Sequence, residues 1–300
     1  MLYHVGALWR LNELGLLNTL DRLASVSGGA LLAGCLAARW SSLRFDDSVA
    51  MNLREQVFED VLRLSRRLID IPAGLAGFLP LMSAASAASR SYRKHLVGDA
   101  TLQDLPDRPR FIFLSTHLQS GQVWRFSKPY MGSWRIGIVK NPPIKLASAL
   151  AASAAFPPFL SPLTLSLAGY KVERTPGADL HSEEFLNQVD LTDGGVFDNL
   201  GLSVLQRRYK TLLISDAGSQ MKVQSGRFHR WGWGQIMRAI DTPTENARAF
   251  QRRELATLFQ NGARSGTMWR LGTNPLDYPV GPFVPVHPDW PFFSERFAPG

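Results

Sequence analysis

The most constraining feature of the sequence is a pair of glycines that directly follows a short apolar run near its start. Residues 24–30 read ASVSGGA. Glycine loses more backbone freedom on folding than any other residue, so a Gly-Gly pair is costly inside a regular element. The residues from Leu20 to Val26 form the apolar run, and those from Ala30 to Trp40 are rich in Ala and Leu at helical spacing. The sequence therefore predicts a strand, a sharp turn and a helix.

A serine at this turn, with glycine two residues further on, has the layout of a nucleophile elbow. Here the serine is Ser27 and the glycine is Gly29, while Ser25 fills the place of the elbow's first glycine. Such a turn holds its nucleophile in a strained backbone conformation, and the N–H of Gly28 would be one donor to an oxyanion. The alternative is a Ser-Gly-Gly turn that only caps the helix.

A serine hydroxyl needs a base, and histidine is the usual one. None of the six histidines has a glycine-rich or strand-end setting, so each is interpreted as a surface or structural residue. His229 and His287 alone stand in the chain order of an ordinary α/β-hydrolase, a fold that also needs several strands before its elbow. A histidine-dependent esterase is therefore a weaker hypothesis.

Asp193 offers another base. The run LTDGGVFDNLGL at 191–202 places Gly194 and Gly195 directly after it, which allows a sharp turn and leaves room beside the carboxylate. If burial raised its pKa, such a carboxylate could accept the Ser27 proton directly. The alternative is a β-turn that uses Asp-Gly-Gly because these residues tolerate positive φ. We expect the two glycine-rich turns to meet in space.

Composition sets wider limits on the class of protein. Apolar residues make up 45% and charged residues 19% of the chain, which is typical of a globular protein. The net charge of +8 favours anionic partners, nucleic acid or acidic lipid headgroups, but also fits an ordinary basic surface. The single cysteine, Cys35, excludes an intramolecular disulfide and is predicted to be buried. We see no membrane-spanning stretch and no secretory signal, and expect a cytoplasmic or peripheral membrane protein.

Helical and strand-like segments alternate along the chain, which favours an α/β sheet covered on both faces. Residues 71–88 carry no charge and are predicted to form either an apolar flap that holds an acyl chain, together with residues 157–162, or a buried loop. Helices are predicted within 2–17, stopping near Gly15, over 49–70, within 145–162, ended by Pro157-Pro158, and over 234–260. Strands are predicted over 110–118, 122–127, 134–139 and 211–218.

Three motifs, in order and spacing, resemble the patatin-like phospholipases: SVSGGA at 25–30, ASAAFPPFLSP at 152–162 and DGGVFDNLGL at 193–202. The resemblance implies a lipid acyl hydrolase with a Ser-Asp dyad, Ser27 as nucleophile and Asp193 as base, and no metal or organic cofactor. Its substrate would be a phospholipid or another acyl-ester lipid at a peripheral membrane surface, and no nucleic acid partner is implied. The segment from Ser153 to Pro158 would support the site without reacting.

The resemblance also implies a fold, a three-layer α/β/α arrangement with a mostly parallel central sheet. Residues 1–218 would form the catalytic domain, and residues 219–300 a helical and proline-rich extension packed on it. The family's glycine-rich turn, which donates most of the oxyanion hole, and its first sheet strand would both precede Met1. We therefore interpret the chain as a late-started or truncated version with the first strand missing. The alternative function is a catalytically impaired protein that only binds lipid surfaces.

Overall fold

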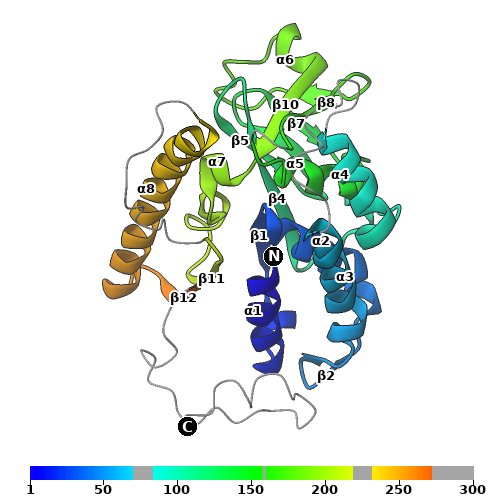
Figure 1. Cartoon of the computed structure of the whole chain (residues 1–300), viewed down its shortest axis with the longest axis vertical. Helices are drawn as coiled ribbons and strands as arrows, with labels where there is room; N and C mark the ends of the chain where they lie inside the picture. The colour runs from blue at the N-terminus through cyan, green and yellow to red at the C-terminus, as the bar shows by residue number, and fades with distance from the viewer. Residues whose placement is uncertain (70–83, 158–159, 219–231, 272–300) are drawn as a thin grey trace.

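The computed structural model describes residues 1–69, 84–157, 160–218 and 232–271, in which eight strands form one sheet with helices on both sides (Figure 1). The strands of this sheet are β1 (Arg22–Val26), β4 (Arg110–His117), β5 (Gln122–Phe126), β6 (Tyr130–Ser133), β7 (Gly137–Lys140), β8 (Leu163–Ser166), β9 (Val172–Glu173) and β10 (Gln188–Asp193). The α-helices are α1 (Leu2–Glu13), α2 (Gly28–Arg39), α3 (Glu59–Ile69), α4 (Ala84–Tyr92), α5 (Leu146–Ser153), α6 (Glu183–Asn187), α7 (Gly195–Asp198) and α8 (Trp233–Gln260).

The sheet is mostly antiparallel, so the prediction of a mostly parallel sheet is wrong. The strand order is β8-β10-β4-β5-β6-β7-β9, with β1 also paired to β4, and among the described pairings of this sheet only that of β1 with β4 is parallel. The reason lies in the connections from β4 to β7, which are three or four residues long. A parallel pair needs a crossover of a dozen or more residues, whereas short turns produce antiparallel hairpins.

Strand β4 lies at the centre of the sheet and is buried on both faces. Phe111 and Phe113 point into the main core with the helices α2 to α5, whereas Ile112 and Leu114 contact Val204 on the opposite face. Successive side chains of a strand alternate between faces, so a strand covered on both sides is apolar throughout. Helices therefore cover both faces of the sheet, as the sequence predicts.

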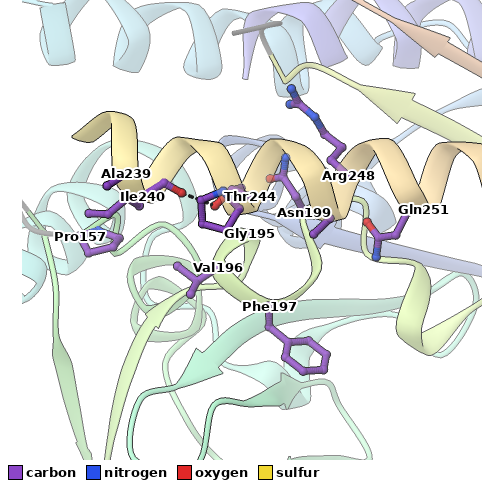
Figure 2. Close-up of a pocket in the computed structure, with 12 residues that line it drawn as sticks. Pro157, Gly195, Val196, Phe197, Asn199, Ala239, Ile240, Thr244, Arg248 and Gln251 are labelled. Carbon is purple, nitrogen blue, oxygen red and sulfur yellow. Dashed lines mark hydrogen bonds between the residues drawn. The ribbon is translucent and has the colours of Figure 1, made fainter. Parts of the chain in front are cut away.

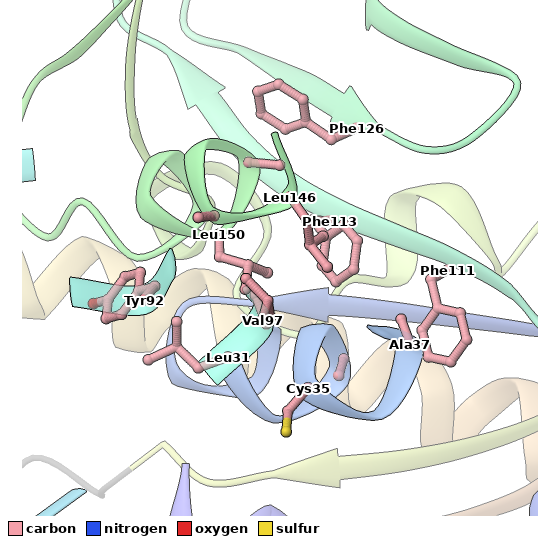
Figure 3. Packing of buried hydrophobic residues seen from close by; sticks show 14 of the residues in the cluster. Leu31, Cys35, Ala37, Tyr92, Val97, Phe111, Phe113, Phe126, Leu146 and Leu150 are labelled. Atoms are coloured by element: carbon pink, nitrogen blue, oxygen red, sulfur yellow. The ribbon is translucent and has the colours of Figure 1, made fainter. Parts of the chain in front are cut away.

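Helix α2 packs closely on α5 beside β4 (Figure 3). Small residues make this approach possible, because a Cβ atom added at Gly34 would lie 2.5 Å from a terminal methyl group of the fully buried Leu150. Cys35 is 0% exposed, and burial, as the first cause, raises the pKa of its thiol to about 12. The prediction that this cysteine behaves as a small buried apolar residue is confirmed.

A second, two-stranded parallel sheet joins β11 (Thr211–Asp216) to β12 (Ser265–Arg270), and α8 connects them. An ion-pair cluster ties α8 to the end of β11. Arg252 Nη1 lies 3.1 Å from Asp216 Oδ2, Arg248 Nη1 lies 3.7 Å from Asp216 Oδ1, and both guanidinium groups also pair with Glu245. Asp216 is 2% exposed, so its charge is neutralised within the protein.

Most predicted elements have counterparts in the structure. The segment 49–70, expected to be one helix, begins instead with β3 (Val49–Ala50), which forms a short hairpin with β2 (Phe45–Asp46). A π-helical turn over Arg54–Phe58 follows, and α3 begins only at Glu59. Of the charge-free stretch 71–88, residues 84–88 belong to α4 and the rest lie outside the described residues. The division at residue 218 stays a prediction; β12 from the second part pairs with β11 from the first. No helix in the described ranges has the length and hydropathy needed to cross a bilayer.

The contact of Gly34 with Leu150 predicts non-additive effects on stability. Gly34→Ala should lower the free energy of unfolding by about 1–3 kcal/mol through overpacking, and Leu150→Ala should lower it by about 2–5 kcal/mol through a cavity. In the double variant the added methyl group enters the vacated space, so urea unfolding should show a loss smaller than the sum by about 1 kcal/mol or more. Strict additivity would contradict this packing.

Gly6→Ala is the matched control. Gly6 lies within α1, and a Cβ atom added there would have no heavy atom within 4 Å. This substitution should raise stability by up to about 1 kcal/mol, because alanine is the better helix former.

Candidate active site

Strands β1 and β10 meet end to end along one edge of β4. β1 runs parallel to β4 as far as the pair of Val26 with Leu114, and β10 runs antiparallel to it and ends at the pair of Asp193 with Ser115. β5 pairs with both Leu114 and Ser115, so β1 and β10 share the opposite edge. The residue after β1 is Ser27. The structure therefore brings together the two glycine-rich turns, as the sequence predicts.

Ser27 has a strained backbone, with φ 52° and ψ −130°. It is among the few non-glycine residues of the described chain with positive φ, a conformation that persists only where the surroundings impose it. The Ser27 side chain makes no capping hydrogen bond to α2, so the helix-capping alternative finds no support in the described residues. Gly28 and Gly29 are the first residues of α2, where backbone N–H groups have no acceptor within the helix.

Ser25, which stands where the elbow has its first glycine, fits its position on β1. Ser25 lies on β1 opposite Phe113, is 8% exposed, and its hydroxyl donates to the Ile112 carbonyl at 3.4 Å. A small polar side chain therefore fits this position of the strand.

Asp193 is 2% exposed and held in place from several sides. Its Oδ1 accepts the Gly195 N–H at 2.7 Å, its backbone N–H donates to the Ala155 carbonyl at 3.0 Å, and its carbonyl accepts the Thr116 hydroxyl at 2.9 Å. Oδ2 is buried without a hydrogen-bond partner among the described residues. One carboxylate oxygen is thus fixed and the other is available.

Burial raises the pKa of Asp193 to about 6. The Ser27 hydroxyl and the Gly195 N–H act in the opposite direction and lower it. The hydroxyl is thus near enough to act on the carboxyl group, but it does not reach the geometry of a full hydrogen bond, since Oδ2 has no partner. Burial and the negative charge of Asp193 together raise the pKa of Tyr92, on α4, to about 12. A carboxylate with a raised pKa is a stronger base than an exposed one.

The glycines after Asp193 are needed for space. Gly194 has φ −63°, so the alternative that Asp-Gly-Gly occurs here for a positive φ is wrong for this residue. A Cβ atom at Gly194 would lie 2.3 Å from the Leu114 carbonyl oxygen, and one at Gly195 would lie 2.6 Å from Asn199 Oδ1. A larger residue at position 194 would push the turn away from β4, and one at position 195 would displace the Asn199 side chain.

Ser153, at the end of α5, links both turns. Its Oγ accepts the Ser27 N–H at 3.2 Å and donates to the Leu114 carbonyl at 2.7 Å, while its own carbonyl accepts the Gly194 N–H at 3.2 Å. The side chain is fully buried. The start of the segment from Ser153 to Pro158 therefore holds the elbow and the Asp-Gly-Gly turn against β4.

His4, on α1, lies beside the elbow, a position that the sequence did not indicate. Its Nε2 is 3.4 Å from the place of a Cβ atom on Gly29, and its Nδ1 is 2.8 Å from Ser215 Oγ on β11. Burial is the main cause that lowers the pKa of His4 to about 4, so the ring is neutral at pH 7. Only the packing of α1 against α2 brings it here, and no sequence signal reports that packing.

The sequence model described as patatin-like phospholipase matches residues 1–205. The chain belongs to this family. Patatin-like phospholipases are lipid acyl hydrolases, so membership indicates this class of activity. A search of curated proteins found no match.

The histidines of this patatin-like chain have no described place beside Ser27 other than that of His4. His229 and His287 lie outside the described residues, so the histidine-dependent alternative stays open. His117 is fully buried on β4, with Nδ1 2.7 Å from Ser120 Oγ, and has a structural place in the sheet. Within the described ranges, no group of His, Cys, Asp or Glu side chains has the arrangement of a metal site.

The raised pKa of Asp193 predicts how stability depends on pH. Its folded value of about 6 lies above the ordinary 3.8, so the protonated form is favoured in the folded state. The stability that this carboxyl group contributes is therefore fully present below about pH 4, the ordinary pKa, and is lost as pH rises through 6. Asp193→Asn keeps a neutral side chain, so by pH 8 it should be more stable than wild type by about 2–3 kcal/mol, and near pH 4 by almost nothing.

Thermal and urea unfolding between pH 4 and 8 measure this difference. Ser27→Ala removes a group that lowers the pKa, so it should move the midpoint of the wild-type pH dependence upward. An Asp193→Asn variant with the same advantage at pH 4 and pH 8 would show that burial does not affect this carboxyl group.

Proposed function

We propose that this chain is a serine acyl hydrolase that cleaves fatty-acyl esters of phospholipids or related lipids through a Ser27-Asp193 dyad. The observation that supports the proposal is the end-to-end meeting of β1 and β10 on β4, because Ser27 follows β1 and the buried carboxylate of raised pKa ends β10. Membership of the patatin-like phospholipase family supports the same reaction class.

In the first half-reaction, Asp193 accepts the proton of the Ser27 hydroxyl as Oγ bonds to the ester carbonyl carbon. Oδ2 is the oxygen suited to take this proton, because Oδ1 is already held by the Gly195 N–H. The tetrahedral intermediate then collapses, and Asp193 returns the proton to the departing alcohol. In the second half-reaction Asp193 takes a proton from water as the water oxygen attacks the acyl-enzyme. Asp193 then returns this proton to Ser27 Oγ as the bond to the acyl carbon breaks and the fatty acid leaves.

Negative charge on the carbonyl oxygen needs donors, and the N-terminus of α2 supplies them. Gly28 and Gly29 begin a helix of 12 residues whose first N–H groups have no internal acceptor. Ser27 directly precedes these residues, so we expect their N–H groups to donate to the oxyanion that forms when Ser27 attacks. Backbone donors of this kind need no cofactor.

Exposed apolar side chains follow the segments that hold the dyad and suit a lipid substrate at a membrane surface. Phe156 is 39%, Val196 46% and Phe197 39% exposed. Phe156 follows the segment that holds both turns, and Val196 and Phe197 belong to α7, directly after the Asp-Gly-Gly turn. Large apolar groups rarely gather at the surface without a partner.

Replacing either member of the dyad should abolish ester hydrolysis. Ser27→Ala removes the nucleophile and Asp193→Asn the base, so each should lower kcat for 4-nitrophenyl butyrate and for phosphatidylcholine vesicles by roughly a thousandfold or more. Ser203→Ala and Asp190→Asn are matched controls outside the dyad and should keep wild-type rates. Turnover retained in both dyad variants would end the proposal.

Reaction with a fluorophosphonate probe gives a second readout. Wild type should be labelled, and Ser27→Ala should not. Binding of anionic vesicles by a wild-type chain that neither reacts with the probe nor hydrolyses esters would instead favour the lipid-binding alternative.

The pH dependence of kcat/KM should report Asp193. Only the ionised carboxylate can accept the Ser27 proton, so kcat/KM should rise with pH through a midpoint near 6, the pKa of Asp193, and fall about tenfold per pH unit below it. His229→Ala with His287→Ala should leave this profile unchanged. Loss of activity in that pair would favour the histidine-dependent esterase, and a flat profile from pH 5 to 7.5 would exclude Asp193 as the base.

A further inference from the structure

A groove of about 550 Å³ lies between α7 and α8 (Figure 2). Its volume is within the range of roughly 300–1,000 Å³ that small-molecule sites occupy. One part of its lining is apolar and comes from Pro157, Val196, Ala239, Ile240, Pro243 and Ala247. In Figure 2 the side of the groove nearest Pro157 carries Val196, Ala239 and Ile240, while Asn199, Arg248 and Gln251 lie towards its other end.

The polar and apolar ends differ in what they offer a ligand. Gln251 donates to Asp198 at 3.0 Å, and Arg248 pairs with Asp216 and Glu245, so these side chains are engaged within the protein. The apolar residues are not covered, since Val196 is 46% exposed and Ala239 and Ala247 are also exposed. The groove therefore suits a hydrocarbon chain better than a charged ligand.

The groove begins beside the dyad carboxylate. Gly195 lines it, and the N–H of the same residue holds Asp193 Oδ1 at 2.7 Å. Pro157, on the other side, follows the segment whose Ala155 carbonyl accepts the Asp193 N–H. The groove is thus lined by residues from both backbone segments that hold Asp193, and its opposite wall is α8.

We propose that the groove between α7 and α8 holds the acyl chain of the ester that Ser27 cleaves. The inference rests on the proposed function and adds the location of its chain-binding subsite. One wall of the groove is α8, which lies beyond residues 1–205, the part that matches the family. Preference for chain length is therefore set by a helix outside the family-matched region.

A bulky residue in the groove should act on long chains selectively. Ala247 is small, exposed and part of the lining, so Ala247→Trp fills the groove without entering the core. Each methylene excluded from an apolar site lowers binding by about fourfold, so two or three excluded methylenes reduce it more than tenfold. The ratio of kcat/KM for 4-nitrophenyl palmitate to that for the butyrate should fall at least tenfold.

Ala256→Trp is the matched control, because Ala256 is exposed on the same helix and does not line the groove. It should leave the ratio at its wild-type value, and both variants should unfold at the wild-type temperature. An unchanged ratio in Ala247→Trp, with butyrate hydrolysis still dependent on Ser27, would show that the groove does not hold the acyl chain. The proposed function would be unaffected.

Direct binding tests the groove even if the chain hydrolyses neither ester. Equilibrium dialysis of radiolabelled palmitate against wild type and Ser27→Ala should show binding that Ala247→Trp weakens at least tenfold and Ala256→Trp does not. Equal palmitate binding by both tryptophan variants, or none by wild type, would overturn the inference whatever the fate of the dyad.

Discussion

The arrangement of the site depends on one edge of β4, where two strands of opposite direction end opposite neighbouring residues. Leu114 marks the end of β1 and Ser115 the end of β10. The Leu114 carbonyl accepts the hydroxyl of Ser153, and the backbone of Gly194 passes so close to it that no side chain would fit. Because β4 is buried on both faces, this junction cannot shift without disturbing the core.

The junction maintains two unfavourable features that an isolated turn would relax. Ser27 keeps a positive φ, and Asp193 keeps a buried carboxylate whose pKa is raised to about 6. Ser153 opposes both relaxations, because it binds the backbone of each turn. The close packing of α2 on α5 fixes Ser153 in turn, since it is the last residue of α5. The packed core thereby maintains the strained backbone of Ser27 and the buried carboxylate of Asp193.

Features with a local cause were accessible from the sequence. The strand, turn and helix around Ser27 and the strand that ends at Asp193 follow from apolar runs interrupted by glycine pairs, which few backbones accept. The family follows from three short motifs. The direction of the sheet was predicted wrongly, although the short intervals between β4, β5, β6 and β7 carried the information.

Features that arise from packing between distant segments were not accessible. The contact of His4 with Ser215 joins α1 to β11, and the groove joins α7 to α8. Neither pair of segments carries a periodicity or spacing that depends on its partner. The need for a glycine at position 194 was equally inaccessible. Only the register of β10 on β4 shows that the Leu114 carbonyl lies against this residue.

Strand β11 has a consequence for anyone who shortens this protein. Ser215 contacts His4 next to the elbow, while its neighbour Asp216 pairs with Arg248 and Arg252 of α8. Adjacent residues of one strand thus couple the first helix to the last one described. A clone trimmed at the family boundary, residue 205, would lose both attachments together, so a minimal expression fragment should extend through β12.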